Sequence, residues 1–281
     1  MTRIRVAVAQ MCSGTRPESN LATIAALAGE AAAGGASYVL TPEMSVAFAA
    51  DREGLAQVSE PFSQNSAIAE CSSLARRNGL YLHLGSLAVR SGDGRHANRS
   101  VLFAPDGEIA ATYDKIHLFD ADPPGDRPYR ESETYRGGDR AVVTTAPGFG
   151  LGLTICYDVR FSGLFSTLAD AGADVIALPA AFTVPTGSAH WETLVRARAI
   201  ETGCFIVAAA QAGRHENGRS TYGHSMVVDP WGEILAIADG ESEGLIFADI
   251  DLEAVGHARR RVPALANRRP FSLSVNPDLP E

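Results

Sequence analysis

Three reactive side chains, those of Glu43, Lys115 and Cys156, each lie at or just beyond the end of a predicted β-strand. In layered α/β proteins the ends of neighbouring strands gather along one edge, where binding sites form. A carboxylate, an ammonium group and a thiol there supply a general base, a cation for an oxyanion, and a nucleophile that forms a thioester. Position alone does not single out this trio, because 33 acidic and 24 basic residues offer many others.

The segment around Cys156 predicts a strand that ends abruptly at the thiol. Leu151, Leu153 and Ile155 alternate with small residues, which is the period-two pattern of a strand. Residues 163–171 have helical spacing, so the backbone must turn sharply just past the sulfur and can aim the thiol into a cleft. The alternative is that Cys156 is a small core hydrophobe, as free cysteines usually are.

The remaining patterns alternate between strand and helix, which predicts a single α/β domain over residues 1–281, with 259–281 a Pro/Arg-rich C-terminal tail. Polar Ser19 and Asn20 are candidate caps for the first helix. The stretch 116–140 has no periodicity, and a loop of that length usually has a function. The predicted strands are 4–10, 38–40, 80–87, 99–104, 109–114, 151–155, 175–178, 204–209, 225–228, 234–238 and 246–250, and the helices are 20–33, 63–78, 163–171, 189–202 and a short one from 252.

A Pro-x-Gly-Glu-Ile string occurs twice, at 105–109 and at 230–234, each time between two predicted strands. Pro and Gly at these positions are typical of a hairpin turn. One such hairpin in each half of the chain indicates a pseudo-twofold arrangement of two sheets.

Composition and charge exclude several classes of protein. The net charge is −9 and the longest basic run is Arg259–Arg261, which argues against a nucleic-acid or anionic-membrane partner. The apolar stretch among the first residues is too short, before polar residues follow, for a secretory segment. No apolar run is long enough for a membrane span, so we expect a cytoplasmic protein. Four cysteines lie far apart without a C-x-x-C pair, and no residue spacing is typical of a metal site, so we expect neither metal nor organic cofactor.

Three segments resemble, in the same order, the signature segments of the nitrilase (carbon–nitrogen hydrolase) superfamily. They are Thr-Pro-Glu-Met at 41–44, Asp-Lys-Ile-His-Leu at 114–118 and Thr-Ile-Cys-Tyr-Asp-Val-Arg-Phe at 154–161. The resemblance extends from Val6 into the Pro/Arg tail. It implies a four-layer αββα sandwich that associates as a homodimer, or a higher homo-oligomer, through its helices.

The same resemblance assigns roles to individual residues. It implies that Cys156 is the nucleophile, Glu43 the general base, and Lys115 the donor that stabilises the tetrahedral intermediate. A second glutamate of the family, in the loop after the lysine, falls best on Glu131, with Glu133 as the alternative. The backbone N–H of Tyr157 would complete the oxyanion hole.

Four further segments resemble the amidase branch of that superfamily, which contains deaminated glutathione amidase and ω-amidase. We therefore expect hydrolysis of a small carboxylate-bearing amide through a thioester, with release of ammonia. Arg127 and Arg130, next to Glu131, could hold the carboxylate, and His190 is a further candidate for substrate binding. The four segments span residues 187–192, 196–202, 211–214 and 222–232. We expect a structural role for three residues within them, Trp191, Arg198 and Glu201, and for Arg160 outside them.

Other activities remain open at this point. They include a nitrilase or carbamoylamine hydrolase of the same superfamily, and a Cys-His hydrolase or acyltransferase that uses His117 or His190 as its base. A non-catalytic interaction module on the same fold is the third alternative. The intact Glu43, Lys115 and Cys156 set argues against it, because an inactive module would be expected to lose a reactive residue.

Overall fold

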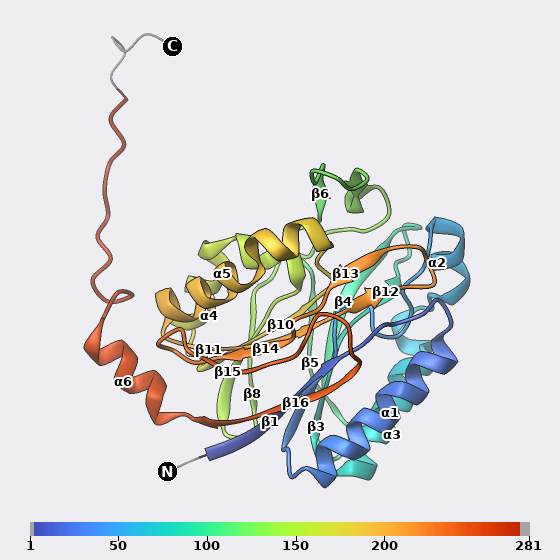
Figure 1. Cartoon of the computed structure of the whole chain (residues 1–281), viewed down its shortest axis with the longest axis horizontal. Helices are drawn as coiled ribbons and strands as arrows, with labels where there is room; N and C mark the ends of the chain where they lie inside the picture. The colour runs from blue at the N-terminus through green and yellow to red at the C-terminus, as the bar shows by residue number, and fades with distance from the viewer. Residues whose placement is uncertain (1–2, 276–281) are drawn as a thin grey trace.

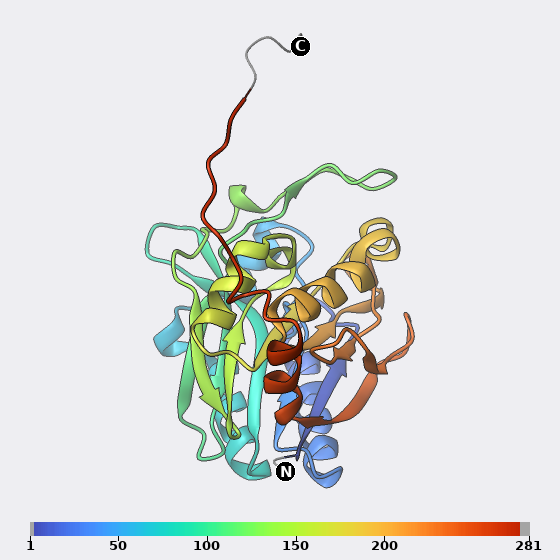
Figure 2. The ribbon, with the colours of Figure 1, turned by 90° about the vertical axis from the view of Figure 1, so that its left-hand side faces the viewer.

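Two six-stranded β-sheets pack face to face, and helices cover their outer surfaces (Figures 1 and 2). The computed structural model describes residues 3–275. Helices α1 and α3 lie against the first sheet, and α4 and α5 lie against the second. The fold is therefore the predicted αββα sandwich.

The first sheet has the strand order β16-β1-β2-β3-β4-β5. Strands β1, β2 and β3 are mutually parallel, whereas β16, β4 and β5 pair antiparallel with their neighbours. The bounds are β1 Arg3–Gln10, β2 Tyr38–Leu40, β3 Tyr81–Arg90, β4 His96–Phe103, β5 Ile109–Asp114 and β16 Gly244–Asp251.

The second sheet repeats this plan with the order β15-β14-β11-β10-β9-β8. Strands β9, β10 and β11 are mutually parallel; β8 and β14 pair antiparallel with β9 and β11, and β15 pairs antiparallel with β14. The two Pro-x-Gly-Glu-Ile turns join β4 to β5 and β14 to β15, at equivalent edges, as the pseudo-twofold interpretation predicts. The bounds are β8 Val142–Ala146, β9 Phe149–Leu153, β10 Val175–Ala180, β11 Phe205–Ala210, β14 Met226–Val228 and β15 Ile234–Ile237.

Helices and short hairpins fill the connections. The helices are α1 Pro17–Ala33, α2 Arg52–Val58, α3 Ser66–Asn78, α4 Ser162–Asp170, α5 Val184–Thr202 and α6 Glu253–Arg261, with 3₁₀ turns η1 Phe62–Gln64, η2 Glu131–Glu133 and η3 Cys156–Arg160. The hairpins are β6 Asp120–Ala121 with β7 Tyr129–Arg130, and β12 Ala212–Arg214 with β13 Ser220–Tyr222. No helix within residues 3–275 is long and apolar enough to span a bilayer.

The alternation of side chains along β1 shows how the layers are separated. Val6 and Val8 belong to the core between the two sheets, whereas Ala7 and Ala9 belong to the core under α1 and α3. Successive side chains of a strand point to opposite faces, so one strand serves two apolar layers. Beyond β1, Met11 makes an isolated parallel bridge to the chain just past β11. The carboxyl ends of the parallel strands in both sheets therefore meet at one edge.

Three predicted helix starts were wrong. The predicted helix 63–78 begins at Ser66, where the side chain of Asn65 caps it, because residues 62–64 form the 3₁₀ turn η1. Helix α1 begins at Pro17, because proline suits the first turn; Asn20 is buried inside the helix and bonds Gly14 and Val46 instead of capping it. Helix α5 begins at Val184, five residues before the predicted start. The side chain of Thr183 caps it, a signal that the glycine and proline nearby obscured.

The predicted tail also needs correction at its start. Arg259–Arg261 form the last turn of α6, and Arg259 donates to the carbonyl oxygens of Ala173 and Thr202 at 2.7 and 3.2 Å. Beyond α6, residues 262–275 form no further helix or strand. The end of the predicted tail, 276–281, lies outside the described residues.

Candidate active site

A cavity of about 230 Å³ opens where the carboxyl ends of the two sheets meet, and Glu43, Lys115, Cys156 and Glu131 all line it. Glu43 lies three residues past β2, and Lys115 directly follows β5. Cys156 lies three residues past β9 in the other sheet. The structure thus brings together all four residues that the sequence analysis selected for catalysis.

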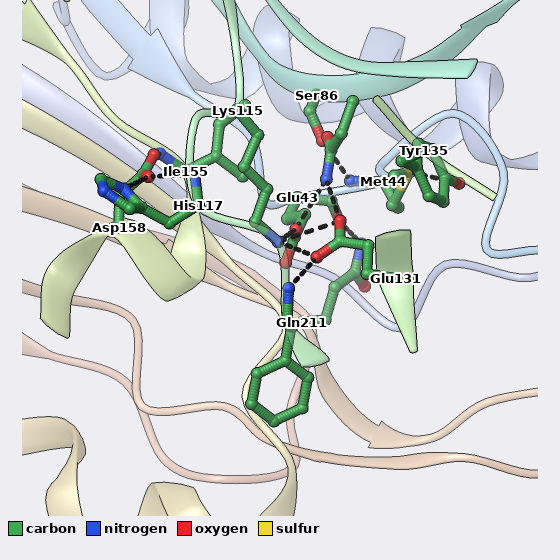
Figure 3. Close-up of polar contacts among 12 residues, drawn as sticks. Glu43, Met44, Ser86, Lys115, His117, Glu131, Tyr135, Ile155, Asp158 and Gln211 are labelled. Atoms are coloured by element: carbon green, nitrogen blue, oxygen red, sulfur yellow. Dashed lines mark hydrogen bonds and ion pairs between the residues drawn. The ribbon is translucent and has the colours of Figure 1, made fainter. Parts of the chain in front are cut away.

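Lys115 is buried between two carboxylates (Figure 3). Its Nζ lies 2.8 Å from Oε1 of Glu43, and 3.1 and 2.9 Å from Oε1 and Oε2 of Glu131. The side chain of Lys115 is only 2% exposed. Glu131 rather than Glu133 fills the second position, because Glu133 is exposed to solvent.

The charges in this cluster determine its protonation. Burial acts to lower the pKa of Lys115, but the two carboxylates and the nearby thiol raise it well above its ordinary 10.5, so the ammonium form persists. Burial acts to raise the pKa of Glu43, but Lys115 and hydrogen bonds from Lys115, Cys156 and Asn98 hold it below its ordinary value. At neutral pH Glu43 is therefore an ionised carboxylate, ready to accept a proton.

Cys156 has an unusual backbone conformation. Its φ is +48°, in the left-handed region that residues other than glycine rarely adopt. Its thiol shares a hydrogen bond with Glu43 and accepts one from the backbone N–H of Ala181. Burial, together with the charge of Glu43, raises the pKa of Cys156 well above its ordinary 9.0, with Lys115 opposing. The resting thiol is protonated and already in contact with a base.

The buried carboxylate of Asp158 fixes this corner. It accepts hydrogen bonds from the backbone N–H of Ile155 at 2.8 Å and from the hydroxyl of Tyr113 at 2.7 Å. It also accepts from the backbone N–H of His117 at 3.1 Å and contacts Nδ1 of the same residue at 2.7 Å. These bonds connect the turn of Cys156 to the segment that follows Lys115.

The backbone N–H of Tyr157, selected as an oxyanion donor, lies in the first turn of η3. The first hydrogen bond of that turn runs from the N–H of Asp158 to the carbonyl of Ile155. Backbone N–H groups before this bond have no acceptor within the turn. The N–H of Tyr157 is therefore not used within the turn, and its role as a second oxyanion donor beside Lys115 stays a prediction.

Two side-chain amides that hold Glu43 in place, those of Asn98 and Gln211, were not predicted from the sequence. Asn98 Nδ2 donates to Glu43 Oε1 at 2.8 Å and to Glu131 Oε1 at 3.3 Å, so it bridges the two carboxylates. Gln211 Nε2 donates to the backbone carbonyl of Glu43 at 2.9 Å. The only signal in the sequence was a polar amide within or directly after a buried strand.

The residues selected for substrate binding are only partly at the cavity. Arg127 and Arg130 line it, and so does Tyr157. The guanidinium of Arg130 is already bonded to both carboxylate oxygens of Asp122, at 2.9 and 3.0 Å. His190 is exposed and does not line the cavity. Its Nδ1 lies 3.3 Å from the guanidinium nitrogens of Arg160, and Arg160 does line the cavity. His117 does not line the cavity either.

Two other arginines border the cavity, and neither was predicted to bind substrate. Arg160 was expected to be structural, and it lies over the rings of Tyr157 and Phe182. Arg219 was not selected at all, because it lies in a short turn that matches none of the motifs. Within residues 3–275, neither arginine forms an ion pair with a carboxylate.

An αββα sandwich with a thiol, a carboxylate and an ammonium group at the bottom of a cavity defines a class of thiol-dependent hydrolase. The sequence matches the Carbon-nitrogen hydrolase family over residues 5–260. The chain therefore belongs to the carbon–nitrogen hydrolase family, which acts on non-peptide carbon–nitrogen bonds.

Curated relatives agree with this family. The chain is 44% identical to deaminated glutathione amidase of Bos taurus over 94% of this chain and 82% of that protein. It is 39% identical to deaminated glutathione amidase of Yersinia enterocolitica over 99% of this chain and 97% of that protein.

Solved structures have the same fold. The NitFhit protein of C. elegans superposes with a TM-score of 0.88 at 36% identity, over 95% of this chain; the chain spans only 65% of the length of NitFhit. A mutant amidase from Nesterenkonia sp. AN1, with the acetamide moiety of fluoroacetamide covalently added at its active-site cysteine, superposes with a TM-score of 0.80 at 27% identity, over 95% of this chain and 94% of that one.

Proposed function

We propose that this protein hydrolyses the amide of a small carboxylate-bearing compound through a thioester on Cys156, and that deaminated glutathione is its substrate. The observation that carries the chemistry is the contact of Lys115 with Glu43 and Glu131 beside the thiol of Cys156. The name of the relatives supports the choice of substrate.

In the first half of the reaction, Glu43 takes the proton of the Cys156 thiol as the sulfur attacks the amide carbon. The carbonyl oxygen becomes an oxyanion, which Lys115 and the N–H of Tyr157 stabilise. Glu43 then gives its proton to the nitrogen, because an amide nitrogen leaves only as an amine. The C–N bond breaks, the amine departs and a thioester remains on Cys156.

In the second half, water replaces the amine and the same carboxylate acts again. Glu43 takes a proton from the water as its oxygen attacks the thioester carbon, and the proton is returned to the sulfur as the C–S bond breaks. The products are a carboxylic acid and the free thiol. A primary amide releases ammonia, whereas the substituted amide of deaminated glutathione releases a larger amine, so the expected release of ammonia holds only for primary amides.

Glu131 has a supporting role in this scheme. Its two oxygens contact Lys115, and Oε2 also accepts the backbone N–H of Phe119 at 2.6 Å. This carboxylate keeps Lys115 charged and fixed in position while Glu43 changes protonation state.

A substrate panel tests the proposal. We would measure kcat/KM, by chromatography of the acid product, for deaminated glutathione, 2-oxoglutaramate, hexanamide and a simple aliphatic nitrile. We expect deaminated glutathione to be the best substrate. A higher value for 2-oxoglutaramate would assign an ω-amidase instead, and faster hydrolysis of hexanamide or of the nitrile would contradict the proposed substrate class.

A further inference from the structure

Arg219 is a cation held at the wall of the active-site cavity by aromatic rings. Its guanidinium carbon lies 4.5 Å from the centre of the Phe48 ring and 5.0 Å from the centre of the Tyr129 ring, and both rings line the same cavity. Ring faces attract cations without neutralising them. The positive charge of Arg219 is thus positioned but not compensated.

The side-chain N–H groups of Arg219 donate no hydrogen bond to any other residue in the described range 3–275. Its Nε is buried and has no hydrogen-bond partner, and no ion pair in residues 3–275 involves its guanidinium. A buried unpaired donor is costly, and such sites usually have a reason. Because Nε is shielded, the two terminal nitrogens are the donors left to meet a ligand in the cavity.

The turn that carries Arg219 is fastened to Phe48. Asn217 Nδ2 donates to the carbonyl of Phe48 at 3.0 Å, while Oδ1 of the same amide accepts the backbone N–H of Arg219 at 2.9 Å. His215 closes the turn by donating its N–H to the carbonyl of Arg219 at 2.8 Å, and its ring packs edge-on against Phe48. The guanidinium is therefore held in place before any ligand binds, which lowers the entropic cost of binding.

A second cation lies on the same aromatic ring. The guanidinium carbon of Arg127 is 5.4 Å from the centre of the Tyr129 ring, so Tyr129 contacts both Arg127 and Arg219. Arg219 also influences the pKa of Tyr135. Burial raises this pKa, and Glu131 and Glu43 raise it further, whereas Lys115 and Arg219 act to lower it. Arg219 and Lys115 also line the same cavity of about 230 Å³, so one small molecule can contact both.

We propose that Arg219, with Arg127 across the Tyr129 ring, binds the carboxylate of the substrate at the end remote from the bond that is cleaved. This inference rests on the proposed amidase function, and it proposes Arg219 in place of Arg130, whose guanidinium is bonded to Asp122. Arg219 is then a specificity-determining residue rather than a catalytic one.

The test uses matched pairs of amides that differ at the remote group, which is a carboxylate in one member and a neutral carboxamide in the other; initial rates for the diamides are halved, because they have two equivalent amides. Succinamate, glutaramate and adipamate each carry an amide and a carboxylate, and succinamide, glutaramide and adipamide are their neutral counterparts. We would measure kcat and KM for each pair with the wild type and with Arg219→Gln, Arg219→Lys, Arg130→Gln and Arg77→Gln. Arg77 pairs with Glu70 on the exposed surface and is the control for a simple loss of positive charge.

We expect Arg219→Gln to lower the acid-to-neutral ratio of kcat/KM about 10- to 100-fold, mainly through KM, as loss of a charge-assisted hydrogen bond would. Arg219→Lys should recover part of that ratio, and Arg130→Gln and Arg77→Gln should keep the wild-type ratio. Activity of each variant on the neutral amide shows that it is folded. Succinate should inhibit hydrolysis of the neutral amide less strongly in Arg219→Gln than in the wild type.

The two proposals can fail separately. An unchanged ratio in Arg219→Gln, or a wild type without preference for the acidic amide, would overturn the role of Arg219 while leaving an amidase. A wild type that hydrolyses none of the amides, deaminated glutathione included, would overturn the proposed function itself.

Discussion

The Oδ1 atom of Asp158 lies 2.7 Å from Nδ1 of His117, and this contact joins the corner of Cys156 to the segment that follows Lys115. The His117 ring in turn stacks on Phe161, with ring centroids 3.5 Å apart. Cys156 and Lys115 follow strands of different sheets, so their relative position depends on contacts of this kind. Asp158, two positions past Cys156, thus helps to hold the thiol and the ammonium group in place relative to each other.

We predict that Asp158→Asn lowers both stability and kcat. The carboxylate of Asp158 now accepts several hydrogen bonds, and an asparagine amide would place its own N–H donors against those donor groups. The free energy of unfolding should therefore fall by about 2–3 kcal/mol. Urea unfolding and steady-state kinetics measure the two effects. Asp170→Asn is the control, since Asp170 pairs on the surface with the exposed Arg268. Equal effects of the two changes would contradict the role of Asp158.

We predict that Cys156→Ala abolishes turnover while the fold remains. The reaction passes through a covalent thioester, and removal of one buried sulfur leaves only a small void. Circular dichroism checks the fold, and intact-protein mass spectrometry should show an acyl adduct on the wild type that is absent from this variant. Cys12→Ala, a change outside the cavity lining, should stay active. Substantial activity in Cys156→Ala would mean that another residue is the nucleophile.

We predict that Glu131→Gln lowers kcat/KM about 100-fold, whereas Glu133→Gln has little effect. Glu131 is the larger electrostatic cause of the raised pKa of Lys115, so its loss lowers that pKa and loosens the ammonium group. The alkaline limb of the pH profile should move to lower pH in Glu131→Gln. The opposite order of the two variants would assign the site to Glu133.

We predict a flat pH profile of kcat/KM between pH 4.5 and 9.0, the ordinary pKa values of Glu43 and Cys156. The pKa of Glu43 is lowered and that of Cys156 is raised, so both leave this window. A limb near pH 6.5 that disappears in His117→Gln or His190→Gln would instead support the Cys-His alternative.

The same shifts predict how stability depends on pH. Because the folded pKa of Glu43 is lowered, its contribution is present above pH 4.5 and is lost as the pH falls through the folded value. Because the folded pKa of Lys115 is raised, its contribution is present below pH 10.5 and is lost as the pH rises through the folded value. Two other shifts narrow the range. Burial lowers the pKa of His83 to about 3, so stability falls as the pH drops below 6.5, and the raised pKa of Cys156 makes stability fall as the pH rises above 9.0. Urea unfolding at several pH values should therefore show a plateau between about pH 6.5 and 9.0, with stability falling on both sides.

We predict that dialysis against a strong chelator leaves the rate unchanged. Glu43, Lys115 and Cys156 already supply base, cation and nucleophile, so the scheme has no step for a metal ion or an organic cofactor. A loss of rate that one added metal ion restores would contradict this prediction. The cytoplasmic location likewise stays a prediction. The homo-oligomer is also a prediction, and gel filtration would test it.

Local patterns in the sequence predicted the strands that position the site. The short apolar runs before Glu43, Lys115 and Cys156 predict strands that end near these residues, because alternating side chains followed by turn residues are enough to mark a strand and its end. The hairpin β6–β7 and the turn at Arg219 escaped prediction. They are short segments whose conformation depends on what they pack against, and no periodicity marks them.

The sequence by itself thus predicted the strands from their periodicity, and the resemblance of three ordered local motifs to the nitrilase superfamily implied the sandwich fold and the three reactive groups. Only the tertiary structure placed Glu131 rather than Glu133 against Lys115, brought Asn98 to Glu43, bonded Arg130 to Asp122 and left Arg219 unpaired at the cavity wall. Each of these facts is a contact between side chains far apart in the chain or in an irregular loop. Such contacts follow from how the two sheets and their loops pack, and local sequence does not encode them.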